Sequence, residues 1–225
     1  MTAEINTTVV VYNTKEILVP DADAVADILG KYRVTVNEPQ VSQIQRYISC
    51  LVYWNQRVSL TSVTSPMEIL ERHFAESMFG ASFIRKKDGR LADVGTGPGF
   101  PGLALKIALP SLQVLSIERN AKKCAFLNEV IRFVDLDAVA VLRSEYSSIS
   151  PREGSFDYIA TRAFGGRKDL LRWAAGRLNP SGEIILWLGL QDSLKLSQSI
   201  GWRWEPPIAI PHSQRRVILA GRPIL

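Results

Sequence analysis

The residues of this chain best suited to bind a ligand are four glycines that follow a short apolar run, in the segment LADVGTGPGFPG at 91–102. Glycine tolerates positive φ and lets the backbone approach a ligand without a clash from a Cβ atom. Residues 97–102 match the dinucleotide pattern GxGxxG, but that pattern also arises by chance. No Gly-Lys-Ser/Thr sequence ends the turn, which excludes a P-loop. The side chains around the turn must therefore decide which ligand it binds.

A different alignment of the same turn, DVGTGPG over 93–99, favours a methyl donor over a dinucleotide. Asp93 would be the last inward-facing acid of a strand, and its carboxylate suits a positively charged ligand such as S-adenosylmethionine but would repel a pyrophosphate. Pro98 and Pro101 lack the backbone N–H groups that a phosphate cradle would use. We therefore predict S-adenosylmethionine as the cofactor. The predicted contacts in the turn come from Asp93, Gly95, Thr96, Gly97 and Gly99.

Two later segments would complete the donor site. Glu118 ends the next expected strand, where a carboxylate can accept hydrogen bonds from both ribose hydroxyls. Its simpler role would be that of an acid at a helix N-terminus. RSEYSS at 143–148 follows the third expected strand, so Glu145 and the backbone of Tyr146 would lie near the adenine, unless this is an ordinary surface loop.

Arg162 follows the fourth expected strand, in FDYIATRAF at 156–164, where the substrate of an open α/β sheet normally lies. The stretch lacks the Asn/Asp-Pro-Pro-aromatic sequence of amine-directed DNA methyltransferases, and it lacks the cysteine that carbon-5 pyrimidine transfer requires. A guanidinium can hold the donor carboxylate, or the O6 and N7 acceptors of guanine, in fork geometry. We expect Arg162 to position donor and acceptor, with a strand-end salt bridge as the alternative.

The elements that must position these residues fall into two parts. Residues 1–82 are predicted to form an N-terminal extension and a helical cap, with apolar positions recurring at helical spacing between 41 and 52. TTVVVY at 7–12 is β-prone but isolated. Ser65, with Pro66 at N1 and Glu68 at N3, has the signature of a capping box at the start of a helix.

Residues 83–225 show a different pattern, in which short apolar runs alternate with helical segments. Near-continuous apolar strands separated by helices predict an α/β fold with an open, mostly parallel, doubly wound sheet. The expected strands are 91–94, 112–118, 138–143, 156–164 and 182–189, followed by two late strands around 202–210 and 215–220. This is a Rossmann-like architecture with a helical N-terminal cap.

The positive charge of the chain is concentrated in its larger part. Residues 1–64 carry five basic and six acidic side chains, whereas residues 65–225 carry twenty-two basic and sixteen acidic ones. Basic clusters lie at 85–90, 119–123, 165–172 and 213–216. Several such clusters in one domain favour a polyanionic partner such as RNA, although each alone could be solvated surface.

Other features of the composition bear on cellular location, membrane association and metal binding. Cys50 and Cys124 are isolated, and no run of apolar residues is long enough to span a membrane. The N-terminus lacks the pattern of an export signal. Two cysteines and two histidines without ligand spacing predict no metal site. We expect a cytoplasmic monomer that does not bind membranes.

Five motifs, WNQRVSLTSV, ERHFAESM, DVGTGPGFPG, RSEY and TRAF, occur in an order and spacing that resemble the ribosomal RNA small subunit methyltransferase G family. The resemblance runs from about residue 40 to the C-terminus. It implies a class I S-adenosylmethionine-dependent methyltransferase core with a helical N-terminal cap, which matches the fold expected above. It also implies methylation of N7 of a guanosine in 16S rRNA with S-adenosylmethionine, and the small ribosomal subunit or its precursor as partner. By position, it implies donor contacts from Gly95, Phe100 (through its backbone), Glu145, Tyr146 and Arg162.

The chain departs from the pattern of that family at three places. Glu76-Ser77 stands where the family has Asp-Ser, Leu188 stands where it has lysine, and GGRKDLL adds a basic pair after TRAF. Loss of a lysine beside the substrate could weaken contacts with phosphate or base.

Guanine N7 carries no proton, so the predicted reaction needs positioning rather than a general base. Glu76 or Asp93 could stabilise the purine as it becomes cationic. His73 shares a helical face with Glu76 and Ser77, although a histidine packed between cap and core is an equally good interpretation.

Two other functions remain open at this stage. In a small-molecule methyltransferase, the positive charge would be incidental. In a diverged RNA-binding protein that keeps the donor pocket without turnover, Leu188 would mark the loss of activity.

Overall fold

The structure is a computed structural model that describes residues 7–150, 154–162 and 168–224. In this part of the chain, eight strands form one sheet in the order β5-β4-β3-β6-β7-β10-β8, with β9 paired to β10. The strands of the sheet are β3 (Arg90–Val94), β4 (Gln113–Glu118), β5 (Val139–Arg143), β6 (Phe156–Thr161), β7 (Leu178–Gly189), β8 (Trp202–Trp204), β9 (Ile208–Ala209) and β10 (Arg216–Pro223).

The strand order places the ligand-binding edge of the sheet. β3, β4, β5, β6 and β7 pair in parallel, whereas β10 is antiparallel to β7 and β8. The chain moves outward from β3 to β4 and β5, and then returns to the other side of β3 with β6. Ligands of such sheets bind at the carboxyl ends of the strands where this reversal occurs. The predicted α/β, mostly parallel, doubly wound fold is confirmed.

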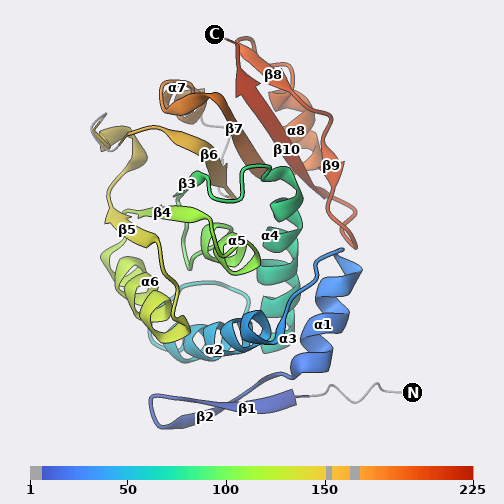
Figure 1. Cartoon of the computed structure of the whole chain (residues 1–225), viewed down its shortest axis with the longest axis vertical. Coiled ribbons are helices and arrows are strands. Elements are labelled where there is room, and N and C mark those ends of the chain that lie inside the picture. Colours follow the sequence, from blue (N-terminus) through green and yellow to red (C-terminus); the bar gives the residue numbers. More distant parts are fainter. Residues whose placement is uncertain (1–6, 151–153, 163–167, 225) are drawn as a thin grey trace.

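Helices cover both faces of the sheet (Figure 1). The helices are α1 (Ala22–Lys31), α2 (Glu38–Asn55), α3 (Pro66–Ile69), α4 (Glu76–Phe79), α5 (Gly102–Ala108), α6 (Ala121–Val134), α7 (Lys168–Ala175) and α8 (Leu190–Leu196). Side chains alternate along each strand, so Leu91 and Val114 face the apolar cluster that contains α2, α5 and α6 residues. Ala92 and Leu115 face the opposite cluster, which contains α7 residues.

The helical cap shares its core with the sheet. Ile44 and Tyr47 of α2 belong to the same buried cluster as Phe126 and Val130 of α6. One continuous apolar core therefore extends across the domain boundary that the sequence suggests at residue 82.

The N-terminal segment differs from the prediction, because β1 (Thr7–Tyr12) is not isolated. It pairs antiparallel with β2 (Lys15–Pro20) in a hairpin. Asn13 and Thr14 form its two-residue turn with φ of 48° and 63°, the left-handed conformation that such hairpins require. Threonine is unusual at this position, which is why the sequence does not show the turn.

The predicted capping box at Ser65 is wrong. Ser65 occupies the N-cap of α3, but its side chain makes no cap hydrogen bond. A capping box instead begins α2, where the Asn37 side chain accepts from the Gln40 N–H and the Gln40 side chain accepts from the Asn37 N–H.

The third predicted helix is also less regular than expected. Between α3 and α4, residues Leu70–Ala75 form a π-helix, and Gly80–Phe83 continue as a 3₁₀ turn. A π-helix leaves carbonyl groups unpaired at its ends, and such segments are frequent at functional sites.

The end of this helix packs against β7 through Trp187. The Trp187 indole Nε1 donates to the carbonyl oxygen of Glu76 at 2.8 Å. A Cβ atom on Gly80 would lie 2.2 Å from Trp187 Cζ2, closer than any normal contact. The helix and the sheet are therefore in contact along bare backbone at Gly80.

We expect Gly80→Ala to destabilise the protein by about 1–3 kcal/mol, because the rigid indole and the backbone must move apart. The free energy of unfolding in urea measures this. Gly30→Ala in α1 is the matched control, since a Cβ atom there meets nothing within 4 Å. Alanine at Gly30 should be neutral or stabilising by about 1 kcal/mol. Equal effects of the two substitutions would contradict the contact.

Candidate functional site

A cleft lies at the carboxyl ends of β3, β4, β5 and β6, where the strand order predicts a ligand. It encloses about 220 Å³. Among the residues that line it are Gly95, Glu118, Glu145, Tyr146 and Thr161. Four of these five are predicted donor-site residues; Thr161 is the neighbour of Arg162.

The glycine turn presents bare backbone to this cleft at Gly95. Its φ is +69°, and an added Cβ atom would meet nothing within 4 Å, so the space beside it is open. Asp93 lies beneath the turn rather than in the cleft, because it is fully buried. Its Oδ2 accepts hydrogen bonds from Thr96 Oγ1 at 2.5 Å and from the Gly102 N–H at 2.7 Å. Asp93 and Thr96 thus hold the shape of the turn from beneath, and their contact with the donor stays a prediction.

The far side of the turn packs on the helical cap. The Tyr47 hydroxyl of α2 donates to the Pro98 carbonyl at 2.6 Å. A Cβ atom on Gly99 would lie 2.0 Å from that same hydroxyl oxygen, and φ at Gly99 is +97°. Phe100 is buried and stacks on Tyr47 with ring centroids 5.4 Å apart. Both this close approach to Tyr47 and the positive φ therefore favour glycine at 99.

Glu118 connects the turn to β4 and lines the cleft. Its Oε2 accepts from the Gly97 N–H at 3.1 Å, and its Oε1 accepts from the Asn120 N–H at 2.8 Å. A carboxylate has about four acceptor sites, so Glu118 retains capacity for two ribose hydroxyls. Both interpretations of Glu118 from the sequence are compatible with this position.

The opposite wall of the cleft combines an aromatic ring with charged side chains. Tyr146 is mostly buried and contacts Trp173 edge to face, with ring centroids 5.5 Å apart. Glu145 Oε2 lies 3.6 Å from Arg119 Nη1. Arg119 and Lys123 also line the cleft. The sequence showed both cations only as part of a basic cluster.

This arrangement fits a positively charged nucleoside. The open backbone at Gly95 admits close approach, Glu118 can bind a ribose, and Tyr146 offers a ring beside it. Two carboxylates, Glu118 and Glu145, and two cations, Arg119 and Lys123, line the cleft, so its charges fit a ligand that carries both a positive and a negative group.

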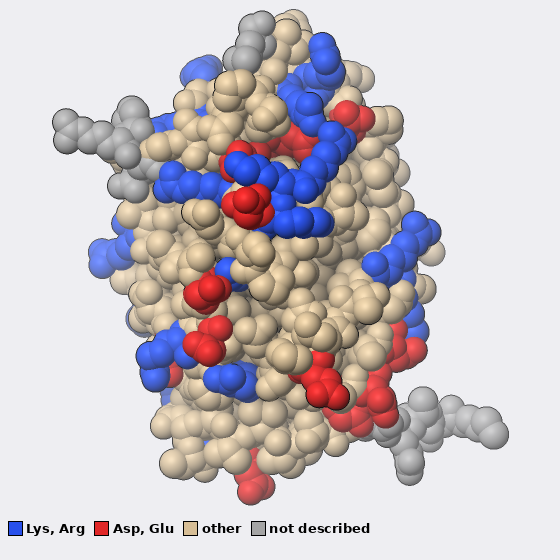
Figure 2. All heavy atoms as spheres, viewed as in Figure 1, with Lys and Arg blue, Asp and Glu red and all other residues tan. Residues whose placement is uncertain are grey.

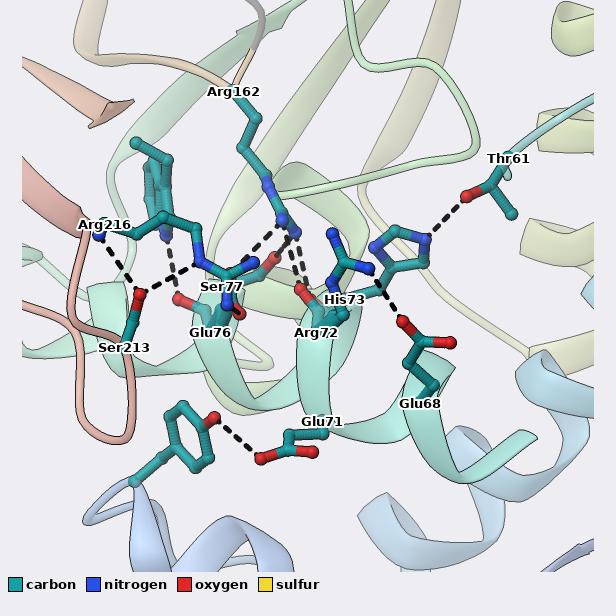
Figure 3. A network of polar contacts seen from close by, with 12 residues as sticks. Thr61, Glu68, Glu71, Arg72, His73, Glu76, Ser77, Arg162, Ser213 and Arg216 are labelled. Carbon is teal, nitrogen blue, oxygen red and sulfur yellow. Dashed lines mark hydrogen bonds and ion pairs between the residues drawn. The ribbon is translucent and has the colours of Figure 1, made fainter. Parts of the chain in front are cut away.

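A second group of residues surrounds Arg162, directly after Thr161 (Figure 3). The Arg162 guanidinium donates to the Arg72 carbonyl at 3.0 Å, to Ser77 Oγ at 3.1 Å and to the His73 carbonyl at 3.5 Å. Arg72 and His73 belong to the π-helix, so Arg162 donates hydrogen bonds to backbone carbonyl groups of this segment. Burial lowers the pKa of Arg162, and Glu76 offsets part of this effect.

Glu76 joins Arg162 to a second arginine. Its Oε2 lies 3.4 Å from Arg162 Nη2, and its Oε1 lies 2.8 Å from Arg216 Nη2, close enough for an ion pair although not aligned for a hydrogen bond. Burial raises the pKa of Glu76, and the two arginines oppose that shift. Glu76 is only 1% exposed, and its ion pairs position Arg162 and Arg216. Its contact with a substrate stays a prediction.

His73 is a packed histidine. Its Nε2 lies 2.9 Å from Thr61 Oγ1, and its ring stacks on Phe100 with centroids 4.9 Å apart. Burial, with Arg162 and Arg72 nearby, lowers the pKa of His73 to about 3. His73 is therefore neutral at physiological pH and is not poised to exchange a proton, which favours the structural alternative for this residue.

Asp93 gives the site a pH dependence. Burial raises the pKa of Asp93 from 3.8 to about 7, although Thr96 and Gly102 partly oppose the shift. In the folded protein Asp93 keeps its proton up to about pH 7, whereas in the unfolded chain it releases the proton near pH 4. Stability should therefore fall as pH rises from about 4 to 7, by an amount on the order of a few kcal/mol, and then become level.

Urea unfolding of the wild type and Asp93→Asn at several pH values measures this effect. The asparagine variant should lose the decline between pH 4 and 7, because its amide does not titrate. Asp88→Asn, on an exposed loop, is the control and should keep the decline. A decline that is unchanged in Asp93→Asn would mean that other groups cause it.

Neither Leu188 nor the basic cluster at 85–90 lines the cleft. Leu188 is buried in the apolar cluster on the α7 side of the sheet. In the cluster at 85–90, Lys86 pairs with Asp157 at 3.2 Å, and Arg90 begins β3, so this cluster lies at the amino edge of the sheet, opposite the cleft. Residues 163–167, which include the end of TRAF and much of the third cluster, lie outside the described residues.

The basic clusters therefore do not form one surface around the cleft. Figure 2 shows the densest group of Lys and Arg side chains in the upper half of the face drawn, with acidic side chains among them. Near the cleft, the cations come from 119–123, and from Arg216 through its pairing with Glu76.

Two kinds of site are absent from the described residues. No helix among them is long and apolar enough to cross a membrane. No group of His, Cys, Asp and Glu side chains among them could hold a metal ion.

Comparison with known proteins adds independent information. A family model described as rRNA small subunit methyltransferase G matches residues 40–199. The chain is 33% identical over 169 residues to the ribosomal RNA small subunit methyltransferase G of Stenotrophomonas maltophilia strain K279a, which covers 74% of this chain and 78% of that protein. It is 31% identical over 186 residues to the protein of the same name from Xanthomonas axonopodis pv. citri, and the match covers 82% of this chain and 86% of that protein.

A solved structure supports the fold. The crystal structure of a SAM dependent methyltransferase from Aquifex aeolicus superimposes with a TM-score of 0.58 at 17% identity, covering 71% of this chain and 94% of that one.

Proposed function

We propose that this chain, which belongs to the rRNA small subunit methyltransferase G family, transfers a methyl group from S-adenosylmethionine to N7 of a guanosine in 16S rRNA. Family membership makes it an rRNA methyltransferase; the atom and the RNA are our proposal. The observation that carries the proposal is the position of Arg162, which directly follows the cleft residue Thr161 and whose guanidinium is held by carbonyl groups of the π-helix.

The residues of the cleft fit S-adenosylmethionine, whose sulfonium supplies an electrophilic methyl group when it is bound. Glu118 would hold the ribose, the Gly95 backbone would allow close approach, and Tyr146 would lie beside the adenine. Asp93, ionised above about pH 7, would add negative charge behind the turn. These contacts position the donor and need no proton transfer.

Methylation at N7 explains why no general base is apparent among the described residues near Arg162. Guanine N7 has an in-plane lone pair and no proton, so the protein needs only to align the acceptor and the methyl group. His73 is neutral and packed, and Glu76 is paired with two arginines. If the rate of methyl transfer changes with pH near 7 in the wild type but not in Asp93→Asn, the change comes from titration of Asp93 in the turn rather than from a general base.

Binding of RNA would use the cations around the cleft. Arg119 and Lys123 line it, and Arg216 lies on the far side of Glu76 from Arg162. We propose the small ribosomal subunit, or its precursor, as the partner of a monomeric enzyme in the cytoplasm. Affinity for RNA should fall with salt, since each phosphate contact releases counterions.

The cofactor can be tested by thermal unfolding with added ligands. S-adenosylmethionine and S-adenosylhomocysteine should each raise the midpoint, by an amount that grows with the ratio of ligand concentration to Kd. NAD(H) should leave it unchanged, because the turn places a buried carboxylate, rather than free N–H groups, behind the ligand. Stabilisation by NAD(H) alone would contradict the predicted donor.

The proposed reaction is tested in cells by mapping modified guanosines in rRNA with and without this gene. Loss of one N7-methylguanosine from 16S rRNA is expected when the gene is deleted. An unchanged modification pattern would favour a small-molecule substrate or an RNA-binding protein without turnover.

A further inference from the structure

A second cavity lies where the N-terminal hairpin meets α2 and α6, away from the methyl-transfer cleft. It encloses about 520 Å³, and its wall includes four aromatic residues, Tyr12, Tyr53, Trp54 and Phe133. Arg57 and Arg132 line it as well. We call this cavity, defined by these six residues, the aromatic pocket.

The rings of the aromatic pocket form one packed group. Tyr12 contacts Tyr53 with ring centroids 5.1 Å apart and Phe133 with centroids 4.8 Å apart, both edge to face. The Trp54 indole Nε1 donates to the Tyr12 hydroxyl at 3.0 Å. The Tyr12 hydroxyl in turn donates to Glu129 Oε1 at 3.0 Å. The polar groups of these rings are therefore already satisfied.

The arginines of the pocket are held in place although they are exposed. The Arg57 guanidinium carbon lies 3.9 Å from the centroid of the Tyr53 ring, and its Nη1 donates to the Tyr53 carbonyl at 2.9 Å. Arg132 Nη2 donates to both carboxylate oxygens of Glu129, at 2.9 and 2.8 Å. An exposed arginine is ordinarily mobile, and immobilising it in advance reduces the entropy lost when a ligand binds.

A planar guanidinium fixed on a tyrosine ring is a stacking surface. Bases of single-stranded RNA stack on aromatic rings and on arginine planes, while nearby cations bind the phosphates. Arg46 adds a third cation, 4.9 Å from the centroid of the Phe133 ring. The only carboxylate among the described lining residues, Glu129, is already paired with Arg132.

The aromatic pocket is within reach of an RNA bound at the cleft. Lys123, near the start of α6, lines the cleft, and Arg132, nine residues later in the same helix, lines the pocket. At about 1.5 Å per residue and about 3.6 residues per turn, these positions are roughly 14 Å apart along the helix axis and on opposite sides of α6, so an RNA that contacts both would pass around this helix.

We propose that the aromatic pocket binds an unpaired nucleotide of the substrate RNA, with its base stacked on the Arg57–Tyr53 pair and its phosphate near Arg57 and Arg132. This deepens the proposed function and rests on it, because it takes RNA as the substrate. A free nucleotide has the same chemistry, and the test distinguishes the two.

The test is photocrosslinking of the full chain to a single-stranded RNA that contains iodouridine, followed by mass spectrometry of the peptides. Crosslinks at Tyr53, Phe133 or Trp54 are expected, in addition to any at the cleft. Arg57→Ala and Tyr53→Leu should each weaken RNA binding by roughly tenfold, since a stacked base contributes that much. Neither should change the affinity for S-adenosylmethionine. Arg203→Ala, an exposed arginine of β8, is the matched control and should bind RNA as the wild type does.

Two results would overturn the proposal: crosslinks confined to the cleft with unchanged affinity in both pocket variants, or binding of free nucleoside monophosphate at the pocket as tight as binding of the RNA. Neither would affect the proposed function, which fails if the protein does not methylate N7 of a guanosine in 16S rRNA. Comparing the midpoints of thermal unfolding of the variants establishes that they fold.

Discussion

Replacing Arg162 with alanine is expected to reduce methyl transfer to rRNA by about 100-fold or more, because misplacement of an acceptor by about 1 Å has an effect of that size. Arg162 contacts Arg72, His73, Ser77 and Glu76 at the same time, so its guanidinium has one fixed position beside the cleft. Single-turnover transfer from labelled S-adenosylmethionine measures the loss.

The control for charge is Arg162→Lys, which keeps a cation but lacks the planar guanidinium with five N–H donors, so it cannot reproduce the four contacts with Arg72, His73, Ser77 and Glu76. It should be nearly as slow as Arg162→Ala. Affinity for the donor should change less than the rate in both variants, because Glu118 and the Gly95 backbone remain. Full activity of Arg162→Lys would show that only the charge of Arg162 matters.

The second large effect is expected at Gly99, where alanine should weaken donor binding by about 100-fold or prevent folding of the turn. The added Cβ atom would lie 2.0 Å from the Tyr47 hydroxyl oxygen, and φ of +97° is a strained conformation for alanine. The Tyr47 hydroxyl also donates to Pro98 in the same turn, so the clash disturbs two adjacent residues. Titration with S-adenosylmethionine by calorimetry measures the affinity.

A second substitution separates the clash from the strain. Tyr47→Phe removes the hydroxyl and should alone weaken donor binding only slightly, because the ring and its packing on Phe100 remain. Gly99→Ala with Tyr47→Phe should recover part of the affinity, since the nearest remaining atom is Leu103 Cδ1 at 2.8 Å. The double variant binding no better than Gly99→Ala would show that strain alone requires glycine.

The sequence predicted the fold and the position of the donor cleft because both depend on local patterns. Apolar strands that alternate with helices define the sheet, and its carboxyl edge then follows from connectivity. Gly95, Glu118 and Tyr146 lie where their positions after three successive strands place them.

The contacts around Arg162 could not be predicted in this way, because they join segments far apart in the chain. Glu76 and Arg216 are separated by 140 positions, and only the antiparallel pairing of β10 with β7 brings Arg216 to the cap. Nothing in the sequence distinguishes Arg216 from Arg215.

The burial of Asp93 is a further limit of the sequence pattern. An acid at the end of a strand is equally consistent with a ligand contact and with a support for the turn. The hydrogen bonds from Thr96 and Gly102 show that Asp93 supports the turn, and they depend on a conformation of the turn that the pattern does not specify.

The central claim is that this chain methylates N7 of a guanosine in 16S rRNA, and one measurement tests it directly. Purified protein is incubated with labelled S-adenosylmethionine and small ribosomal subunits from cells that lack the gene, and the rRNA is digested and examined by mass spectrometry. We predict one labelled N7-methylguanosine in the wild-type reaction and almost none with Arg162→Ala. Label on an exocyclic nitrogen or on a carbon, or transfer only to a small molecule, would contradict the account.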